Sequence, residues 1–433
     1  MVPTFPQRET GMANDQFKAA AQTVDITPDL SRYDVRLHGY GARGSKHAEG
    51  VHDPIHAKIL LLERGDTRAA IVTTDILQID ATLRQDTAER AALTGLTREN
   101  LVMTASHSHS APAALEPRMQ ALPSRFNWFV AEYYEACVSK IVAGLKEAEA
   151  RLVPARCASA RTNLVGTVRN RRVPGYSYDS RAFTTPVGAG EVIDDELAVV
   201  HFVDDDDAVI ATLVNLAGHG TVLGSDNMLI SADWPGTMQR GVEQQLGGVC
   251  LFANGAEGNV APDCGAGVLG FDEVDEFGGR IASHVTALMQ ELSPLTPTHF
   301  AIRSATLALP PFTLSEESPY VRGRLSRQEA LDLIANRYPG QIEMTFIRLG
   351  DVGMVTIPGE MLTELSVDFK QRAAAKGIRL PLILGLANDS VAYIPSPQEY
   401  AKGGYEAGMC FYGPTLGTLL IDNALDGLRN LFA

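Results

Sequence analysis

Two histidines follow a short apolar segment near residue 105, and their spacing is the first sign of chemistry in this sequence. The segment NLVMTAS predicts a buried strand over residues 100–106, and SHSHSAP follows it at 106–112. In an extended backbone, residues i and i+2 project to the same face, so His107 and His109 can point into one site. Neutral imidazoles in this arrangement suit a zinc ion; the alternative is a turn in which both rings are hydrogen-bonded.

Three further polar side chains stand where apolar segments end. His219 lies between two glycines in NLAGHGT, and glycines permit the close backbone approach that is typical of a strand opening into a site. Glu360 follows a proline and a glycine at the start of a helical pattern, where an acidic residue could equally stabilise the helix N-terminus. Tyr393 follows an apolar strand and a turn in GLANDSVAYIP, and packing is the alternative to catalysis there.

The elements that must position these residues alternate between strands and helices. Short apolar segments rich in β-branched residues predict strands at 58–65, 69–79, 100–106, 197–203, 209–218, 248–255, 298–310, 342–359 and 381–387. Helical spacing predicts helices at 125–150, 235–247, 271–292, 330–338 and 361–377. No internal repeat or low-complexity linker marks a boundary. The simplest account is a flexible segment over 1–20 and one large α/β domain over 21–433, with mixed β-sheets flanked by helices.

Composition and charge exclude several classes of protein. The chain has 433 residues, of which 45% are hydrophobic and 21% charged, which is ordinary for a globular protein. Its formal net charge of −15 would repel nucleic acids and anionic membranes, so we expect neither as a partner. Five scattered cysteines indicate neither a disulfide framework nor a thiolate zinc cluster. Without an apolar signal at the N-terminus, we expect a cytoplasmic protein that acts on a small molecule. Whether it forms a homo-oligomer stays open.

Together these motifs resemble one family, the neutral/alkaline non-lysosomal ceramidases, over about residues 21–425. SHSHSAP is similar to the family's T-H-T-H-S-G-P segment, NLAGHGT to its strand-terminating histidine, NGAEGNVAP to its G-D-V-S-P loop and PGEMLTEL to P-G-E-F. The longest match is VAYIPSPQEYAKGGYEAG, followed by YGPTLG, which resembles Y-I-T-T-x-E-E-Y-x-x-Q-x-Y-E-G followed by G-P-x-T-L. The resemblance implies a divergent catalytic domain with the fold of this family.

Carried over by position, the resemblance implies a zinc ion held by His107, His219, Glu360 and the phenol of Tyr393. It also implies that His109 and Arg171 face the substrate. Arg171 lies in VRNRR, which is similar to the family's I-N-R-S-P segment. Two imidazoles, a carboxylate and a weak oxygen ligand suit a catalytic zinc that lowers the pKa of water to about 7. We expect His109 to carry a proton and Arg171 to stabilise negative charge.

Two departures limit what can be inherited from the family. The serine that the family uses in the G-D-V-S-P loop is replaced by Ala261, which has no hydroxyl. We also expect the family's further C-terminal β-sandwich domain and its secretion to be lacking. The predicted function is therefore a zinc-dependent hydrolase in which a metal-activated water attacks a small polar substrate, at an amide C–N bond and not in ceramide itself.

Two alternatives stay open. The first keeps the zinc ion but changes the reaction to glycoside cleavage, or to a lyase or cyclase step on a sugar-like molecule. In that case Asp75, Asp233 and Glu257 are candidate general acids, although each could equally be structural. The second is a binding protein that has lost catalysis together with the serine.

Overall fold

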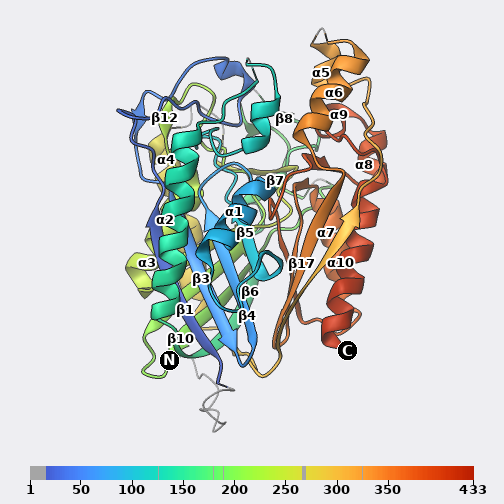
Figure 1. Ribbon diagram of the computed structural model, residues 1–433. Coiled ribbons are helices and arrows are strands. Elements are labelled where there is room, and N and C mark those ends of the chain that lie inside the picture. Colours follow the sequence, from blue (N-terminus) through green and yellow to red (C-terminus); the bar gives the residue numbers. More distant parts are fainter. Residues whose placement is uncertain (1–15, 125, 179, 189, 266–269, 324) are drawn as a thin grey trace.

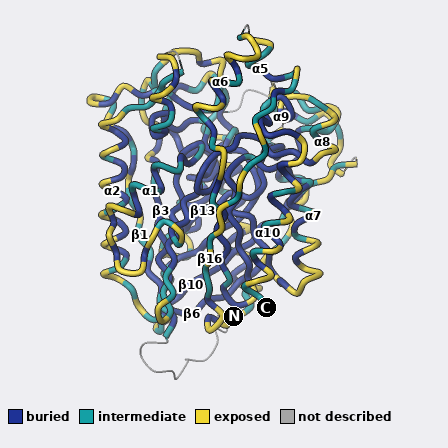
Figure 2. The backbone as a smooth tube through the Cα atoms, turned by 45° about the vertical axis from the view of Figure 1, so that its right-hand side comes forward, coloured by how far each residue is buried: buried dark blue, intermediate teal, exposed yellow. Residues whose placement is uncertain are grey.

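Two β-sheets packed face to face form the middle of the molecule, and helices cover the outer face of each sheet (Figure 1). The structure is a computed structural model that describes residues 16–433, apart from 125, 179, 189, 266–269 and 324. Figure 2 shows that buried residues are concentrated in the sheets, whereas exposed residues mark outer helices such as α2 (Ala131–Ala150) and α7 (Thr363–Ala374). The layers therefore run helix, sheet, sheet, helix.

The larger sheet has nine strands in the described part of the chain. Its order is β13-β11-β10-β6-β1-β3-β4-β5, and β15 pairs with β6. Most neighbours are antiparallel, but β4 with β5 and β11 with β13 are parallel, so the sheet is mixed as predicted. The strands are β1 (Lys18–Asp25), β3 (His56–Arg64), β4 (Thr67–Thr74), β5 (Leu101–Ala105), β6 (Val153–Asn163), β10 (Glu196–Asp204), β11 (Val209–Leu216), β13 (Val249–Asn254) and β15 (Ser293–Pro294).

The smaller sheet has four strands in the order β16-β17-β18-β20. The pairs β16 with β17 and β17 with β18 are antiparallel, and β18 with β20 is parallel. Its strands are β16 (Phe300–Ala308), β17 (Gln341–Leu349), β18 (Val352–Thr356) and β20 (Leu380–Leu384). Alternate residues of β17, β18 and β20 face the larger sheet, where Leu349, Met354 and Leu382 pack against Leu60, Leu213 and other buried side chains.

Helices cover the outer face of each sheet with apolar side chains. Tyr133 and Ile141 of α2 pack in one cluster with Ile59 and Val72, and Trp234 and Ile281 of α3 and α4 pack in another with Val214 and Phe252. On the smaller sheet, Phe369 of α7 and Leu420 of α10 pack with Phe346. The helices are α1 (Ala81–Ala91), α2 (Ala131–Ala150), α3 (Asp233–Leu246), α4 (Phe271–Leu288), α6 (Arg327–Arg337), α7 (Thr363–Ala374) and α10 (Leu416–Phe432).

Short elements gather at one end of the sheets, the upper end in Figure 1. Paired short strands are β2 (Gly50–Val51) with β12 (Leu229–Ile230), β7 (Val168–Asn170) with β14 (Val260–Pro262), β8 (Tyr176–Ser177) with β9 (Ala182–Phe183), and β19 (Glu360–Met361) with β21 (Tyr393–Ile394). The short helices are α5 (Pro319–Arg322), α8 (Pro397–Ala401) and α9 (Gly404–Gly408), with 3-10 turns η2 (Gly41–Arg43) and η4 (Pro117–Ala121). A further 3-10 turn, η3 (Arg98–Asn100), precedes β5 at the opposite end of that strand. Several residues singled out above lie in or beside these short elements.

The predicted fold class, a mixed α/β domain with helices on the outside of its sheets, is confirmed. The boundaries differ in places. Strand β1 begins at Lys18, ahead of the predicted start of the domain at Ala21. Residues 1–15 of the predicted flexible segment 1–20 lie outside the described residues. Helix α2 begins at Ala131, later than the predicted 125. Across the described helices, none combines the length and apolar character needed to span a bilayer.

Candidate metal centre

The ends of strands from both sheets bring the polar residues together. His107 and His109 follow β5, His219 follows β11 and Glu257 follows β13, all in the larger sheet, whereas Glu360 follows β18 of the smaller sheet. The two histidine segments are joined directly, because Ser108 and Gly220 form a β-bridge and the backbone N–H of His109 donates to the carbonyl of Gly220 at 3.0 Å. A Cβ at Gly220 would lie 2.8 Å from the His107 carbonyl, so this approach requires glycine, as the flanking glycines predict.

His107 presents its Nε2 nitrogen to the centre. Its Nδ1 lies 2.8 Å from the carbonyl oxygen of Leu77, and since a carbonyl only accepts, Nδ1 carries the proton. Nε2 is then left with its lone pair and lies 3.3 Å from Oε2 of Glu360. The ring is buried, and the backbone at His107 has a φ of 67°, an uncommon left-handed conformation for a side chain with a Cβ.

His219 is oriented in the same way. Its Nδ1 donates to the carbonyl of Glu257 at 2.8 Å, so its Nε2 is also unprotonated and lies 3.4 Å from the same Oε2 of Glu360. The centroids of the His107 and His219 rings are 4.6 Å apart. Burial, with the nearby positive charge of Arg171, lowers the pKa of His219 to about 4, which keeps the ring neutral.

The carboxylate of Glu360 lies between these two nitrogens. Its Oε2 is buried and has no hydrogen-bond partner in the described part of the chain. Burial alone would raise the pKa of Glu360, but His107 and His219 outweigh it and hold the pKa well below its usual value. Tyr393 lies opposite Glu360 in the parallel pairing of β19 with β21, and burial raises the pKa of its phenol well above the usual range.

His109 completes a cluster of three imidazoles. Its ring centroid is 4.9 Å from that of His107 and 5.7 Å from that of His219. Both of its ring nitrogens are buried and have no hydrogen-bond partner among the described residues, and the ring of Tyr40 packs edge-on at 4.8 Å. Burial, followed by the neighbouring His107, lowers the pKa of His109 well below its usual value.

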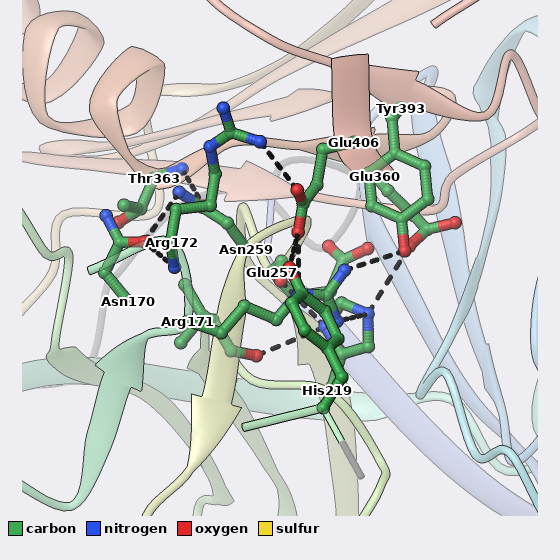
Figure 3. A network of polar contacts seen from close by, with 12 residues as sticks. Asn170, Arg171, Arg172, His219, Glu257, Asn259, Glu360, Thr363, Tyr393 and Glu406 are labelled. Atoms are coloured by element: carbon green, nitrogen blue, oxygen red, sulfur yellow. Dashed lines mark hydrogen bonds and ion pairs between the residues drawn. The ribbon is translucent and has the colours of Figure 1, made fainter. Parts of the chain in front are cut away.

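Arg171 connects the centre to its surroundings, as Figure 3 shows. One terminal nitrogen donates to Nε2 of His219 at 2.9 Å, the other donates to the hydroxyl of Tyr393 at 3.0 Å, and Nε donates to Glu406 at 2.9 Å. Glu406, on α9, also pairs with Arg172 at 2.6 Å. The sequence interpretation overlooked Glu406, which lies in the conspicuous GGYEAG segment of the family resemblance and could have been noted there.

The three candidate general acids have different surroundings. Both oxygens of Asp75 are occupied, one by the backbone N–H of His56 at 2.8 Å and the other by Gln239 at 2.9 Å. Asp233 accepts hydrogen bonds from the backbone N–H groups of Val222, Leu223 and Trp234. Asp75 and Asp233 therefore stabilise the fold. Glu257 alone of the three joins the centre.

Glu257 is completely buried, and neither of its carboxylate oxygens has a hydrogen-bond partner within the described chain. Burial, followed by the charge of Glu360, raises the pKa of Glu257 well above its ordinary value. A carboxylate oxygen of Glu257, one of Glu360 and a ring nitrogen of His107 all lie within 4.8 Å of one another, and so do ring nitrogens of His107, His109 and His219. Nε2 of His219 accepts from Arg171, but the converging atoms of His107, His109, Glu257 and Glu360 include buried ones without a hydrogen-bond partner among the described residues. Such a set of nitrogen and oxygen atoms fits a divalent metal ion.

Comparisons with known proteins point to one family. The family model described as neutral/alkaline non-lysosomal ceramidase, N-terminal, matches residues 17–269, which is more than half of the chain. A neutral ceramidase from Pseudomonas aeruginosa is 24% identical over 466 aligned residues, which cover 90% of this chain and 68% of that protein. A neutral ceramidase from Mycobacterium tuberculosis is 23% identical, and the match covers 55% of this chain and 39% of that protein.

Solved structures show the same fold. The crystal structure of neutral ceramidase from Pseudomonas aeruginosa superimposes with a TM-score of 0.79 at 22% identity, covering 96% of this chain and 75% of that one. A structure described as ceramidase complexed with C2 superimposes with a TM-score of 0.78 at 22% identity, and the match again covers 96% of this chain and 75% of that one. The fold extends through almost all of this chain, whereas a quarter of the solved chains lies outside the match.

Proposed function

Because the chain belongs to the neutral/alkaline non-lysosomal ceramidase family, we propose that it is a zinc-dependent hydrolase that cleaves an amide C–N bond in a small polar substrate other than ceramide. One observation carries this proposal. Nε2 of His107 and Nε2 of His219 face one buried oxygen of Glu360, at 3.3 and 3.4 Å, and that oxygen has no hydrogen-bond partner among the described residues. These three residues, with the phenol of Tyr393, would hold the ion.

A zinc ion bound there would supply Lewis acidity and lower the pKa of water at the site. The chain's own residues set the remaining conditions. The backbone carbonyls of Leu77 and Glu257 fix the tautomers of His107 and His219, so that Nε2 of each ring carries a lone pair. The lone pair of His219 accepts a hydrogen bond from Arg171, which a bound ion would displace. His109, whose two ring nitrogens have no partner in the described chain, has one nitrogen free to accept a proton and one free to donate.

Arg171 would stabilise negative charge that develops on the substrate. Its guanidinium is buried and held by Glu406, so it is in place before the reaction. An ion bound to Nε2 of His219 would release the N–H of Arg171 that now donates to that nitrogen, and this N–H could then bond the substrate. Its contacts with His219 and Tyr393 place it beside the proposed ligands, as Figure 3 shows. Burial would by itself lower the pKa of Arg171, but Tyr393 and Glu406 outweigh it, so the pKa is raised and the positive charge is retained.

The replacement of serine supports a substrate other than ceramide. Ala261 lies on β14, buried and paired with Arg169 of β7, at the position that resembles the family's serine. A methyl group can neither attack a carbonyl nor donate a hydrogen bond to one. The charged and hydroxyl groups around Arg171, namely Arg172, Glu406 and Tyr178, suit a polar ligand better than an alkyl chain.

A substrate screen with controlled metal content tests this function. The protein is stripped with a chelator, reloaded with zinc, and assayed against N-acyl amides of polar amines, glycosides, and short-chain and long-chain ceramides in detergent, with products identified by mass spectrometry. We expect zinc-dependent release of an acid and an amine from a polar amide. Turnover of ceramide with kcat/KM above about 10⁴ M⁻¹s⁻¹ would contradict the proposed substrate class, and a protein that binds no metal would contradict the function itself.

A further inference from the structure

Glu257 is an unusual carboxylate. It is completely buried, it has no hydrogen-bond partner for either carboxylate oxygen in the described structure, and no cationic side chain is paired with it there. A buried carboxylate without a partner is costly, and native proteins resolve that cost with a proton, a cation or hydrogen bonds. The surroundings of Glu257 should therefore indicate whether a proton, a cation or hydrogen bonds compensate its carboxylate.

The backbone brings Glu257 against Glu360. Gly258 packs directly on the backbone of Glu360, and a Cβ at Gly258 would collide with the Glu360 carbonyl oxygen. The N–H of Gly258 also donates to the carbonyl of Met361 at 2.8 Å, which joins the loop after β13 to β19. Two carboxylates are thereby held close together in a buried place, although each would avoid the other if nothing lay between them.

Glu257 also belongs to the machinery that orients the imidazoles. Its backbone carbonyl accepts the Nδ1–H of His219 at 2.8 Å, while one of its carboxylate oxygens lies within 4.8 Å of ligand atoms of His107 and Glu360. Figure 3 shows Glu257 among the residues of this network, between Arg171 and Glu360. One residue therefore contacts the centre through its backbone and reaches into it with its side chain.

We propose that Glu257 is a further carboxylate ligand of the metal ion at this centre, so that the ion is held by two carboxylates, Glu257 and Glu360. This inference rests on the proposed function in one respect, that the centre binds a divalent metal. A divalent cation compensates both buried carboxylates at once, which a proton shared between them does not. It also gives the unpartnered oxygens of Glu257 a partner. His107, His219, Glu360 and Glu257 would then be the four firm ligands, and water would reach the ion where the weakly bound phenol of Tyr393 gives way, because catalytic zinc keeps one position for water.

Metal binding by Glu257→Gln, which has nearly the same shape and no charge, tests the proposal. Zinc affinity is measured by competition with a chromophoric chelator, and thermal unfolding is followed with and without zinc. We expect the zinc dissociation constant to rise at least about 10-fold, because loss of groups at metal sites typically costs that much or more. The metal-free variant should unfold at or above the wild-type temperature, since it no longer buries an unpartnered carboxylate.

Glu343→Gln is the matched control. Glu343 is also largely buried, but it lies on β17 and pairs with Arg84 at 2.6 Å and Arg98 at 2.8 Å. Its replacement should lower the unfolding temperature of the metal-free and zinc-loaded proteins alike and leave zinc affinity unchanged. A purely structural role of Glu257 would give that same pattern in Glu257→Gln and would overturn the proposal.

Cobalt substitution gives a readout that is independent of affinity and activity. Removal of one ligand from the ion changes the visible absorption of the Co²⁺ protein, so the spectrum of Glu257→Gln should differ from that of the wild type. Glu257→Asp, which keeps the charge but shortens the side chain, serves as a second variant, and an intermediate zinc affinity is expected. If the wild type binds no metal, the proposed function fails. If the wild type binds zinc and Glu257→Gln binds it equally with the same cobalt spectrum, only the role of Glu257 fails.

Discussion

Nδ1 of His107 lies 2.8 Å from the backbone carbonyl oxygen of Leu77, and this contact decides which nitrogen of the ring is protonated. The ring must donate from Nδ1, which leaves Nε2 facing Glu360. The left-handed backbone of His107 costs about 1–3 kcal/mol and persists only where the surrounding structure imposes it. The fold therefore holds the histidine in its orientation before any ligand arrives.

The first prediction concerns metal content. The purified protein should contain about one zinc ion per chain, and His107→Ala or His219→Ala should remove most of it, because each change deletes a nitrogen of the proposed ligand set. Elemental analysis after dialysis measures the occupancy. His201→Ala is the control, since His201 is a buried histidine on β10 that bonds Thr212 at 2.9 Å, outside the centre. Full occupancy in a variant lacking both His107 and His219 would refute the assignment.

The second prediction concerns Arg171. Arg171→Lys should lower kcat by about 10²- to 10³-fold, because a lysine offers one compact charge and cannot bond His219, Tyr393 and Glu406 at once. Steady-state kinetics on the amide found in the screen measure kcat and KM separately. Arg169→Lys is the matched control on β7, the strand that Arg171 follows. Arg169 pairs with Glu191 at 3.2 Å, and its replacement should affect stability more than kcat. Equal losses of kcat in both variants would argue against a specific role for Arg171.

The third prediction concerns the missing serine. Ala261→Ser should not raise activity on the wild-type substrate, because the proposed chemistry uses no side-chain nucleophile. Mass spectrometry of the wild-type protein after rapid quenching should detect no covalent intermediate. An adduct on any side chain would disprove direct attack by water.

The fourth prediction concerns pH and uses a histidine outside the centre. Burial lowers the pKa of His201 to about 4 in the folded protein, whereas it titrates near 6.5 in the unfolded chain. Between those values the unfolded chain binds more protons, so His201 lowers the free energy of unfolding as the pH falls from about 6.5 to 4. The full effect is about 3 kcal/mol, at 1.36 kcal/mol per pKa unit. Urea unfolding at pH 7 and pH 4.5 measures how much the free energy of unfolding falls between these pH values. The fall should be smaller for His201→Gln than for the wild type. Equal falls in the two proteins would mean that protonation of His201 does not cause the effect.

The fifth prediction concerns removal of the metal. Because the proposed ligands come from both sheets, a chelator should lower the unfolding temperature of the whole domain and not of one loop. At a free zinc concentration of about 100 times the dissociation constant, binding stabilises the fold by about 2.7 kcal/mol. Calorimetry with and without chelator measures this difference. An unchanged unfolding temperature in a protein shown to release its zinc would mean that the ion contributes nothing to the fold.

Most of the long strands and buried helices could be predicted because their apolar patterns are strong. Strands β1 and β6, in the middle of the larger sheet, were not predicted, since their segments KAAAQTVD and VPARCASARTN mix small and polar residues. The segments at 58–65 and 69–79 form the hairpin of β3 and β4. Helix α1 could not be predicted in this way, since its buried face includes Arg84 and Thr87 and therefore carries no apolar periodicity. Helix α10 could have been predicted, because its buried leucines and isoleucine recur at helical spacing.

At the centre, the sequence indicated residues at strand ends but not the contacts between them. Arg171 and Glu406 are separated by 235 positions, and no local pattern pairs them. Glu257 stood among three acids of equal standing. Its unpartnered carboxylate oxygens and the packing of Gly258 on Glu360 distinguish it from Asp75 and Asp233 in the described structure. Such distinctions depend on tertiary contacts and lie beyond what spacing along the chain can show.

The division of the centre between two sheets also bears on the order of events during synthesis. His107 and His219 leave the ribosome long before Glu360, Tyr393 and Glu406, which belong to the second sheet and the elements after it. A nascent chain that has completed the first sheet therefore presents two oriented imidazoles but neither the proposed carboxylate ligand Glu360 nor the acid that holds Arg171. The proposed ligand set is complete only once both sheets have been translated and packed together, so a chain that still lacks the second sheet also lacks the proposed metal site.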